Sequence, residues 1–302
     1  MPNDSSSLLE VVGGRLAHLE WQSAKRRPSG PLSQGAVELA GYFERSKAPL
    51  ERFEGPVGNV VVVFNLGPRL EIDVSSRASA SVTRPRSGFV SGLGDYGARV
   101  RHPGEQRGLQ INLHPPYARE LFGVPLHEVA DRVFELEELL PSRLRSLPGQ
   151  LTSMPSWSER FEALELAFNR QVAAASRETP RKVMDWALAA IRRSHGRVSV
   201  ADLADRTGYS EKHFRRLFLE HVGVSPRRFA RIVRFEGLAE WVRTEPHRSF
   251  SDLAVLTGFF DLAHLHREVR SITGMTPTAW RHSLVPDGPM SDSYEAIEKG
   301  AR

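Results

Sequence analysis

From about residue 57 to residue 113, short apolar runs alternate with breaks at Gly, Pro and Ser, a pattern typical of strands joined by turns. Residues 57–66, VGNVVVVFNL, predict a buried strand. Four further segments rich in β-branched residues predict strands: 69–74, 80–84, 97–102 and 108–113. The front of the chain is therefore expected to be a β-rich domain.

After this region the apolar positions take on helical spacing. A helix is predicted to start with Pro115 in its first turn, and a second helix is predicted over 125–140, PLHEVADRVFELEELL. Residues 157–175 predict a third helix that is more apolar than one buried face requires, so we expect it to contribute to self-association. No convincing strand follows Arg181, which predicts a second domain made of helices alone.

One pattern occurs twice in that helical region. Residues 201–204, ADLA, and residues 251–254, SDLA, open the two copies, and each is followed by Thr, Gly and an aromatic residue. Glycine can adopt the positive φ that ends a helix, and Ser210 and Asp261 can then cap the next helix. A short helix, a turn with glycine and a second helix make a helix-turn-helix motif, so the region predicts two of them.

The second helix of each copy has an apolar face and a polar face. The predicted buried stripes are Phe214, Leu217, Phe218 and Val222 in the first copy and Leu262, Leu265, Val269 and Ile272 in the second. The opposite faces carry Lys212, Arg215, Arg216 and Leu219 in the first copy and Ala263, His266, Arg267 and Arg270 in the second. Such side chains, one turn apart, suit a helix in the DNA major groove, where Arg can bind guanine through two hydrogen bonds. A solvated helix surface is the alternative interpretation.

Residues 226–246 predict one long helix between the two copies, bounded by a proline at each end. At 1.5 Å per residue the stretch from about Arg227 to Arg243 is roughly 25 Å long, so the helix could hold two recognition helices in successive major grooves, about 34 Å apart. The repeat therefore predicts one chain that reads two turns of a DNA duplex. Arg227, Arg228 and Arg231 on the long helix fit phosphate contacts and ordinary surface charge equally well.

Charge is divided unevenly along the chain. Residues 181–283 hold 18 Lys and Arg against 11 Asp and Glu, a net charge of +7, whereas residues 1–180 hold 21 of each and are neutral. A basic region on an otherwise neutral protein favours binding of a polyanion. On charge alone, a solvated basic surface is an equally good interpretation.

Composition excludes several other functions. The absence of cysteine removes thiol nucleophiles, disulfide frameworks and cysteine-ligated zinc. No apolar run approaches the roughly 20 residues that cross a bilayer, and the N-terminus does not resemble a secretory signal, so a cytoplasmic protein is expected. His102 and His114 are isolated, and no nucleophile or acid/base pair stands out. We therefore expect no enzyme, metal or cofactor.

The expected fold class is α+β, with a β-rich N-terminal domain that has flanking helices and an all-α C-terminal domain that has two helix-turn-helix motifs. The predicted boundaries are 8–175 for the first domain, 176–180 for a linker and 181–283 for the second domain. The polar ends, 1–7 and 284–302, are expected to be disordered.

Residues 181–283 resemble the DNA-binding domain of the AraC/XylS family of bacterial transcription regulators. The resemblance is carried by GYSEKHFRRLF and GFFDLAHLHREV, and by the closing GVSPRRFAR and GMTPTAWRH. It implies base-reading positions at Lys212, Arg215 and Arg216 in the first recognition helix and at Leu262, Ala263, His266 and Arg267 in the second. Leu262 and Ala263 replace polar residues of the commoner pattern, and Val269 stands where Phe is usual. Leu262 and Ala263 fit contacts with a thymine methyl group, and Leu262 fits the core as well. The first recognition helix is therefore expected to carry more of the sequence specificity.

Regulators of this family usually carry an N-terminal domain for effector binding or dimerisation, often a small cupin-like β-barrel. The resemblance thus implies a sequence-specific transcription regulator, gated by a small molecule at the N-terminal domain. The alternative is a constitutive or partner-regulated DNA-binding protein whose N-terminal domain only dimerises. Expected partners are operator DNA and a second copy of the chain, with RNA polymerase and a small-molecule effector as further candidates and no membrane. The effector, the operator and the sign of regulation stay open.

An aromatic and basic set of side chains is the candidate lining of an effector site, with core or surface positions as the alternative. The set is Trp21, Phe64, Phe89, Tyr96, Arg99 and Arg101. His264 aligns with His213 in the two copies, which predicts a packing or capping role shared by both.

Overall fold

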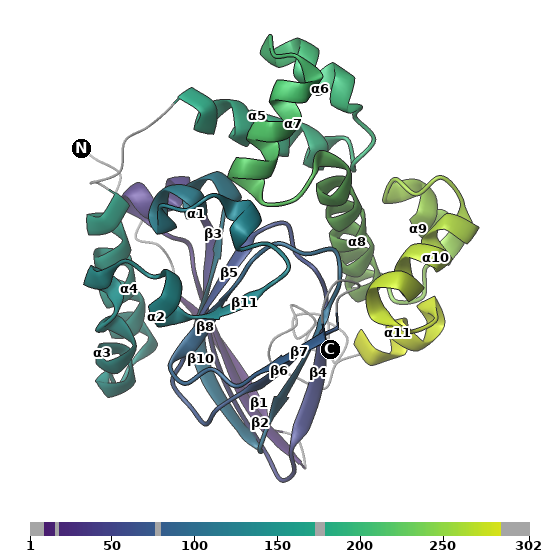
Figure 1. The fold of residues 1–302 in the computed structure, drawn as a ribbon. Helices are drawn as coiled ribbons and strands as arrows, with labels where there is room; N and C mark the ends of the chain where they lie inside the picture. The colour runs from purple at the N-terminus through teal and green to yellow at the C-terminus, as the bar shows by residue number, and fades with distance from the viewer. Residues whose placement is uncertain (1–8, 16–17, 76–79, 173–178, 285–302) are drawn as a thin grey trace, which may run out of the picture.

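The computed structural model describes residues 9–15, 18–75, 80–172 and 179–284. Residues 176–178 of the predicted linker lie outside these ranges. The predicted disordered ends, 1–7 and 284–302, also lie outside them, except for Leu284. The predicted fold class is confirmed, because a β-rich N-terminal half is followed by a C-terminal half made of helices (Figure 1).

Two antiparallel sheets build the N-terminal half. The larger has the order β1 (Glu10–Arg15), β2 (Leu19–Arg26), β3 (Ala36–Ser46), β10 (Glu105–Leu113), β5 (Val60–Asn65), β8 (Gly88–Ser91) and β11 (Val133–Glu135). The smaller has the order β4 (Leu50–Glu54), β9 (Ala98–His102), β6 (Glu71–Ser75) and β7 (Ala80–Thr83). The strands predicted at 57–113 are confirmed as β5, β6, β7, β9 and β10.

Strand β5 divides its side chains between the two faces of the larger sheet, as the two-residue period of a strand requires. Val60, Val62 and Phe64 pack under helices, in a core that includes Phe161 and Phe168. Val61 and Val63 face the smaller sheet, where a second core contains Tyr42, Leu70, Ile72, Val74 and Phe89. The larger sheet therefore lies between a helical layer and the smaller sheet.

Helices α1 (Pro115–Phe122), α3 (Leu147–Ser153) and α4 (Trp157–Val172) cover the outer face, together with short helices η1 (Gly30–Gln34) and η3 (Ser142–Leu144). The predicted helix over 125–140 is wrong. This segment forms η2 (Leu126–Glu128), the strand β11 and the single turn α2 (Leu136–Leu139). Asp131 has a φ of 61°, which ends helical geometry there, and the following residues pair with β8 instead.

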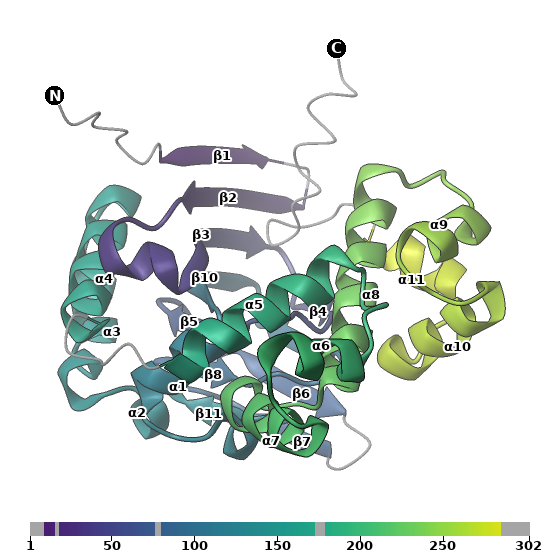
Figure 2. The same cartoon turned by 90° about the horizontal axis from the view of Figure 1, so that it is seen from above.

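The C-terminal half contains helices alone among its described residues. They are α5 (Thr179–Arg193), α6 (Val200–Thr207), α7 (Glu211–Val222), α8 (Pro226–Thr244), α9 (Phe250–Leu256), α10 (Leu262–Thr273) and α11 (Pro277–Leu284). Two helix-turn-helix units, α6–α7 and α9–α10, lie on either side of the long helix α8, as predicted (Figures 1 and 2). None of the described helices is both long and apolar enough to span a bilayer.

The two helix-turn-helix units differ in what they pack against. The first shares one continuous core with the β-rich half, because α7 lies against α1 and η2, and α5 lies against α1. The second packs with the C-terminal part of α8 and with α11 in a separate core, which the front half reaches through Phe53. The predicted domain boundaries stay a prediction.

Candidate nucleic-acid interface and effector cavity

Matching caps build the two helix-turn-helix units. The Ser210 side chain accepts a hydrogen bond from the His213 N–H at 3.3 Å, and Asp261 accepts one from the His264 N–H at 2.6 Å. The turns contain Gly208 at φ +71° and Gly258 at φ +85°, the left-handed region that favours glycine. Both predicted caps and both predicted glycine turns are confirmed.

The aligned histidines also pack alike. The His213 ring lies edge-on to Tyr209 with centroids 4.8 Å apart, and the His264 ring lies edge-on to Phe259 at 5.4 Å. The shared packing role is therefore confirmed. It fixes the start of each recognition helix against the turn before it.

The apolar stripes of both recognition helices are buried, with one exception. Phe214, Leu217, Phe218 and Val222 of α7 and Leu265, Val269 and Ile272 of α10 all lie in the core. Leu262 does not, because 39% of it is exposed. It is the first residue of α10, one turn ahead of the part of the helix that meets the core, so its assignment to the buried stripe is corrected.

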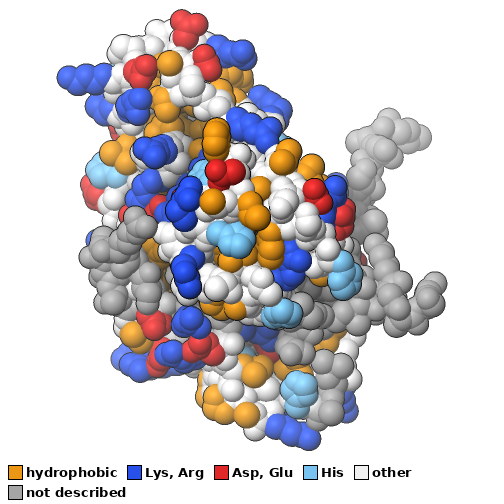
Figure 3. All heavy atoms as spheres, turned by 90° about the vertical axis from the view of Figure 1, so that its right-hand side faces the viewer, with side chains coloured by type: hydrophobic (Ala, Val, Ile, Leu, Met, Phe, Trp, Pro, Cys, Tyr) orange, Lys and Arg blue, Asp and Glu red, His pale blue; other side chains and the backbone are white. Residues whose placement is uncertain are grey.

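The opposite faces are exposed. Lys212, Arg215 and Arg216 of α7 are solvent-facing, as are Ala263, His266, Arg267 and Arg270 of α10. Arg215 donates to Glu211 at 2.8 Å and Arg216 contacts the His213 ring at 3.2 Å, both within one turn of the same helix. On the side that carries α9–α11, Lys, Arg and His side chains lie among exposed hydrophobic ones (Figure 3). That these residues read bases stays a prediction.

Arg228 of α8, a candidate phosphate contact, is partly exposed and pairs with the β-rich half. It donates to Asp95 at 3.0 and 2.6 Å and to Asp131 at 2.8 Å. The neighbouring Arg231 donates to the same Asp95 and to Glu268 of α10. Burial raises the pKa of Asp95, but hydrogen bonds from Arg231 and Arg228 outweigh it and hold that pKa below its ordinary value. DNA phosphate would have to compete with two aspartates for Arg228, so its predicted role depends on this contact opening.

A second loop of the β-rich half holds the same helix. In the β4–β5 loop, the Gly58 N–H donates to Glu236 of α8 at 2.9 Å, and the Gly58 carbonyl accepts from Arg192 at 2.8 Å. Arg192 also pairs with Glu236 at 3.0 Å. In the β8–β9 loop, the Gly97 N–H donates to the Ile272 carbonyl of α10 at 3.4 Å. These two loops, together with Asp131 before β11, therefore hold the helix that joins the two helix-turn-helix units.

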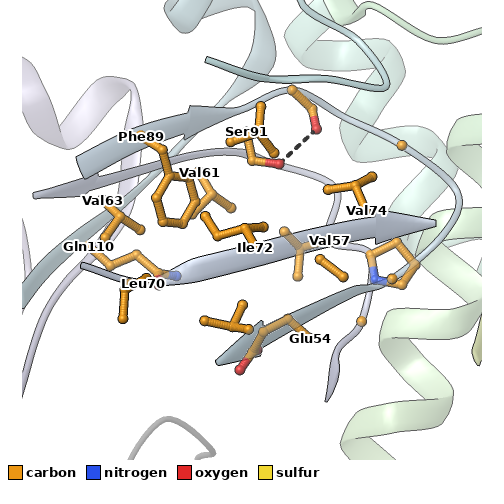
Figure 4. A pocket seen from close by; sticks show the side chains of 18 of the residues that line it. Glu54, Val57, Val61, Val63, Leu70, Ile72, Val74, Phe89, Ser91 and Gln110 are labelled. Atoms are coloured by element: carbon orange, nitrogen blue, oxygen red, sulfur yellow. Dashed lines mark hydrogen bonds between the residues drawn. The ribbon is translucent and has the colours of Figure 1, made fainter. Parts of the chain in front are cut away.

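These two loops also line a cavity of about 140 Å³ between the two sheets (Figure 4). Of the candidate effector-site residues, Phe89 and Tyr96 line it and the others do not. Phe64 points to the helical side of the sheet, where it meets Phe168. Arg99 and Arg101 lie on the other face of β9 and pair with Glu51 and Glu71. The proposed lining is corrected for these residues and for Trp21, since alternate residues of a strand face opposite sides.

The isolated histidines lie apart from this cavity. His102 is buried and accepts a hydrogen bond from the Gly104 N–H at 3.4 Å. Burial lowers its pKa against the effect of nearby Glu44, and burial likewise lowers the pKa of His114. Within the part of the chain that the structure describes, no group of three or more His, Cys, Asp or Glu side chains is placed to hold a metal ion.

Comparison with known proteins identifies the C-terminal segment. Residues 203–283 match the helix-turn-helix domain family, which confirms the resemblance to AraC-type DNA-binding domains and supports a DNA-binding transcription regulator rather than an enzyme. No curated protein matches the chain.

Solved structures give a weak likeness over most of the chain. ToxT from Vibrio cholerae is 9% identical with a TM-score of 0.45, covering 80% of this chain and 100% of that chain. A structure of ToxT from the same organism bound to an unsaturated fatty acid is 10% identical with a TM-score of 0.44, covering 81% and 99%. The AraC-like transcriptional activator CuxR is 16% identical with a TM-score of 0.27, covering 77% and 81%. Identities and TM-scores this low carry no argument about function.

Proposed function

We propose that this chain, whose residues 203–283 are an AraC-type helix-turn-helix domain, is a sequence-specific transcription regulator gated by a small molecule in the β-rich half. The recognition helices α7 and α10 read bases. Lys212, Arg215 and Arg216 act from the first helix and Ala263, His266, Arg267 and Arg270 from the second, with Arg228 as a phosphate contact.

One observation carries the gating proposal: the two loops that line the cavity are the loops that hold α8. Gly94 and Tyr96 line the cavity on either side of Asp95, which accepts hydrogen bonds from Arg228 and Arg231. A ligand that displaces this loop changes the contact with α8 directly. Its effect on the free energy of DNA binding cannot exceed the difference between its binding free energies for the held and released arrangements.

The second candidate function is a constitutive or partner-regulated DNA-binding protein whose β-rich half only dimerises. Leu166 on α4 agrees with the dimerisation in this candidate, because this large apolar side chain is 53% exposed on a helix predicted to mediate self-association. In this case the cavity has no regulatory role.

A ligand screen on the full-length chain separates the two functions. Metabolites that raise the melting temperature would be re-tested for their effect on the affinity for an operator selected from random DNA. A ligand at a concentration of about 100 times its Kd raises the free energy of unfolding by roughly 2.7 kcal/mol. A melting experiment detects a change of this size. Gating predicts that the stabilising ligand also changes operator affinity. A stabilising ligand without such an effect favours the second function.

A further inference from the structure

The cavity between the sheets has mostly apolar walls, and its lining includes an acidic side chain but no basic one. Val61, Val63 and Phe89 of the larger sheet face Ile72 and Val74 of the smaller sheet and Leu70, just before β6, across it. Among the described residues that line it there is no Lys, Arg or His. The ionisable acid of the lining is Glu54, at the end of β4 (Figure 4).

The polar part of the lining combines acceptor oxygens with the hydroxyl groups of Tyr42, Ser91 and Tyr96. The Asn59 Oδ1 atom is buried without a hydrogen-bond partner among the described residues. The Gln106 side-chain amide donates to the Glu44 carboxylate at 2.6 Å, and that of Gln110 donates to Asn112 at 2.9 Å. Each glutamine therefore keeps its oxygen as an acceptor and one amide hydrogen as a donor.

Its electrostatic environment distinguishes Glu54 from these neutral polar groups. Burial raises the pKa of Glu54 above its ordinary value, although Arg52 and Arg243 act to lower it. Arg52 pairs with Glu44 and Arg243 pairs with Glu240 at 3.0 Å, and neither arginine lines the cavity. A ligand in the cavity thus meets a half-buried carboxyl group and no cation in the wall.

These groups discriminate between ligands of the same shape. A carboxylate would lose its hydration beside Glu54 and gain no cation, which is costly for a buried charge. An ammonium group would gain a charged partner and could also donate to Asn59. A neutral hydroxyl could donate to Asn59 but would gain no ion pair.

We propose that this cavity binds a small, mostly apolar amine of about one ring in size, with its ammonium group paired to Glu54. The size follows from the volume of about 140 Å³, since an engineered apolar cavity of roughly 150 Å³ holds benzene. The inference rests on the effector role proposed for this cavity and specifies the ligand class.

The test compares benzylamine, benzyl alcohol and benzoate by calorimetric titration of the full-length chain. Benzylamine is expected to bind on the order of tenfold more tightly than benzyl alcohol, because its ammonium group forms an ion pair with Glu54 whereas the hydroxyl group adds only a hydrogen bond. Benzoate is expected not to bind. Equal binding of benzoate and benzylamine, or no binding by any of the three, would overturn the assignment.

Variants locate the preference. Glu54→Gln keeps the shape and removes the charge, so it should reduce the preference for amine over alcohol to within about twofold. Glu105→Gln, on an exposed surface pair with Arg45, should leave the preference unchanged. If Glu54→Gln does not fold, Asn59→Asp provides the second test, because an added carboxylate should strengthen the amine preference. A preference retained in Glu54→Gln, or unchanged in Asn59→Asp, contradicts the proposal.

These titrations contain no DNA, so their failure leaves the regulator itself untouched. Gating fails separately if a bound amine does not alter operator affinity.

Discussion

The contact between Asp95 and helix α8 should restrain DNA binding, and Asp95→Asn tests this restraint. Asp95 accepts hydrogen bonds from the Arg228 Nε and Nη2 atoms at 3.0 and 2.6 Å, and also from Arg231. Asparagine keeps the size of the side chain and removes its charge. We expect the variant to weaken the hold on both arginines, which keep Asp131 and Glu268 as partners, and to bind the operator more tightly.

The magnitude follows from the exposure of the pair. A hydrogen bond to a charged group contributes about 1.5–3 kcal/mol, and an exposed ion pair contributes about 0–1 kcal/mol. The side chains of Arg228 and Asp95 are 34% and 18% exposed, which lies between these cases. We therefore expect a change of about 1–2 kcal/mol, a roughly 5–30-fold gain in operator affinity if the held arrangement predominates.

The assay is fluorescence anisotropy of a labelled operator with the full-length chain. Glu128→Gln is the matched control, since it removes one negative charge from an exposed site in the same half. Because the pKa of folded Asp95 is depressed, the contact stabilises fully above the unfolded-state pKa of about 3.9 and is lost only as pH falls through the lower folded value. The effect should thus be constant between about pH 6 and 8. Equal affinities for Asp95→Asn and Glu128→Gln would refute the restraint.

Three further predictions concern the fold, the phosphate contact and self-association. In thermal unfolding, Gly258→Ala should lower the free energy of unfolding by about 1–3 kcal/mol more than Gly208→Ala. Both glycines have a positive φ, but an added Cβ would lie 2.3 Å from the His195 carbonyl oxygen at Gly258 and would meet nothing within 4 Å at Gly208. Similar losses would contradict this packing. Arg228→Ala should lower the slope of log affinity against log salt by about one contact, for operator and scrambled DNA alike. An unchanged slope would exclude a phosphate contact. Leu166→Glu should convert a dimer to a monomer in sedimentation at tens of micromolar. If the unsubstituted chain is monomeric both free and on DNA, the self-association proposal is wrong.

Local signals explain why the C-terminal half could be predicted. The caps at Ser210 and Asp261, the glycine turns and the apolar stripes each act within a few residues, and the repeat doubles every signal. Leu262 was misassigned because periodicity marks a face but not where along a helix the core begins.

The front half shows the limit of the same reasoning. The eleven-residue strand β3 was not predicted, because Glu44 falls at a buried position that reads as polar. Its burial is satisfied by Arg52, on β4, and by Gln106, on β10 far along the chain. Likewise, the cavity and the contact of Asp95 with Arg228 join segments that are distant in sequence. No local pattern could indicate them.

The most direct test of the account is selection of bound sites from random DNA by the full-length chain, repeated with Arg216→Ala and Arg267→Ala. If one chain reads two turns of DNA, the selected sites should contain two sequence elements about 10–10.5 base pairs apart. Arg216→Ala should relax one element, at a cost of about 1–3 kcal/mol for the lost guanine contact, and Arg267→Ala should relax the other element less. The neighbours of Arg216 are polar, whereas Leu262 and Ala263 near Arg267 are not. A single element, or equal loss of affinity for operator and scrambled DNA in Arg216→Ala, would contradict the claim that one chain reads two turns of DNA.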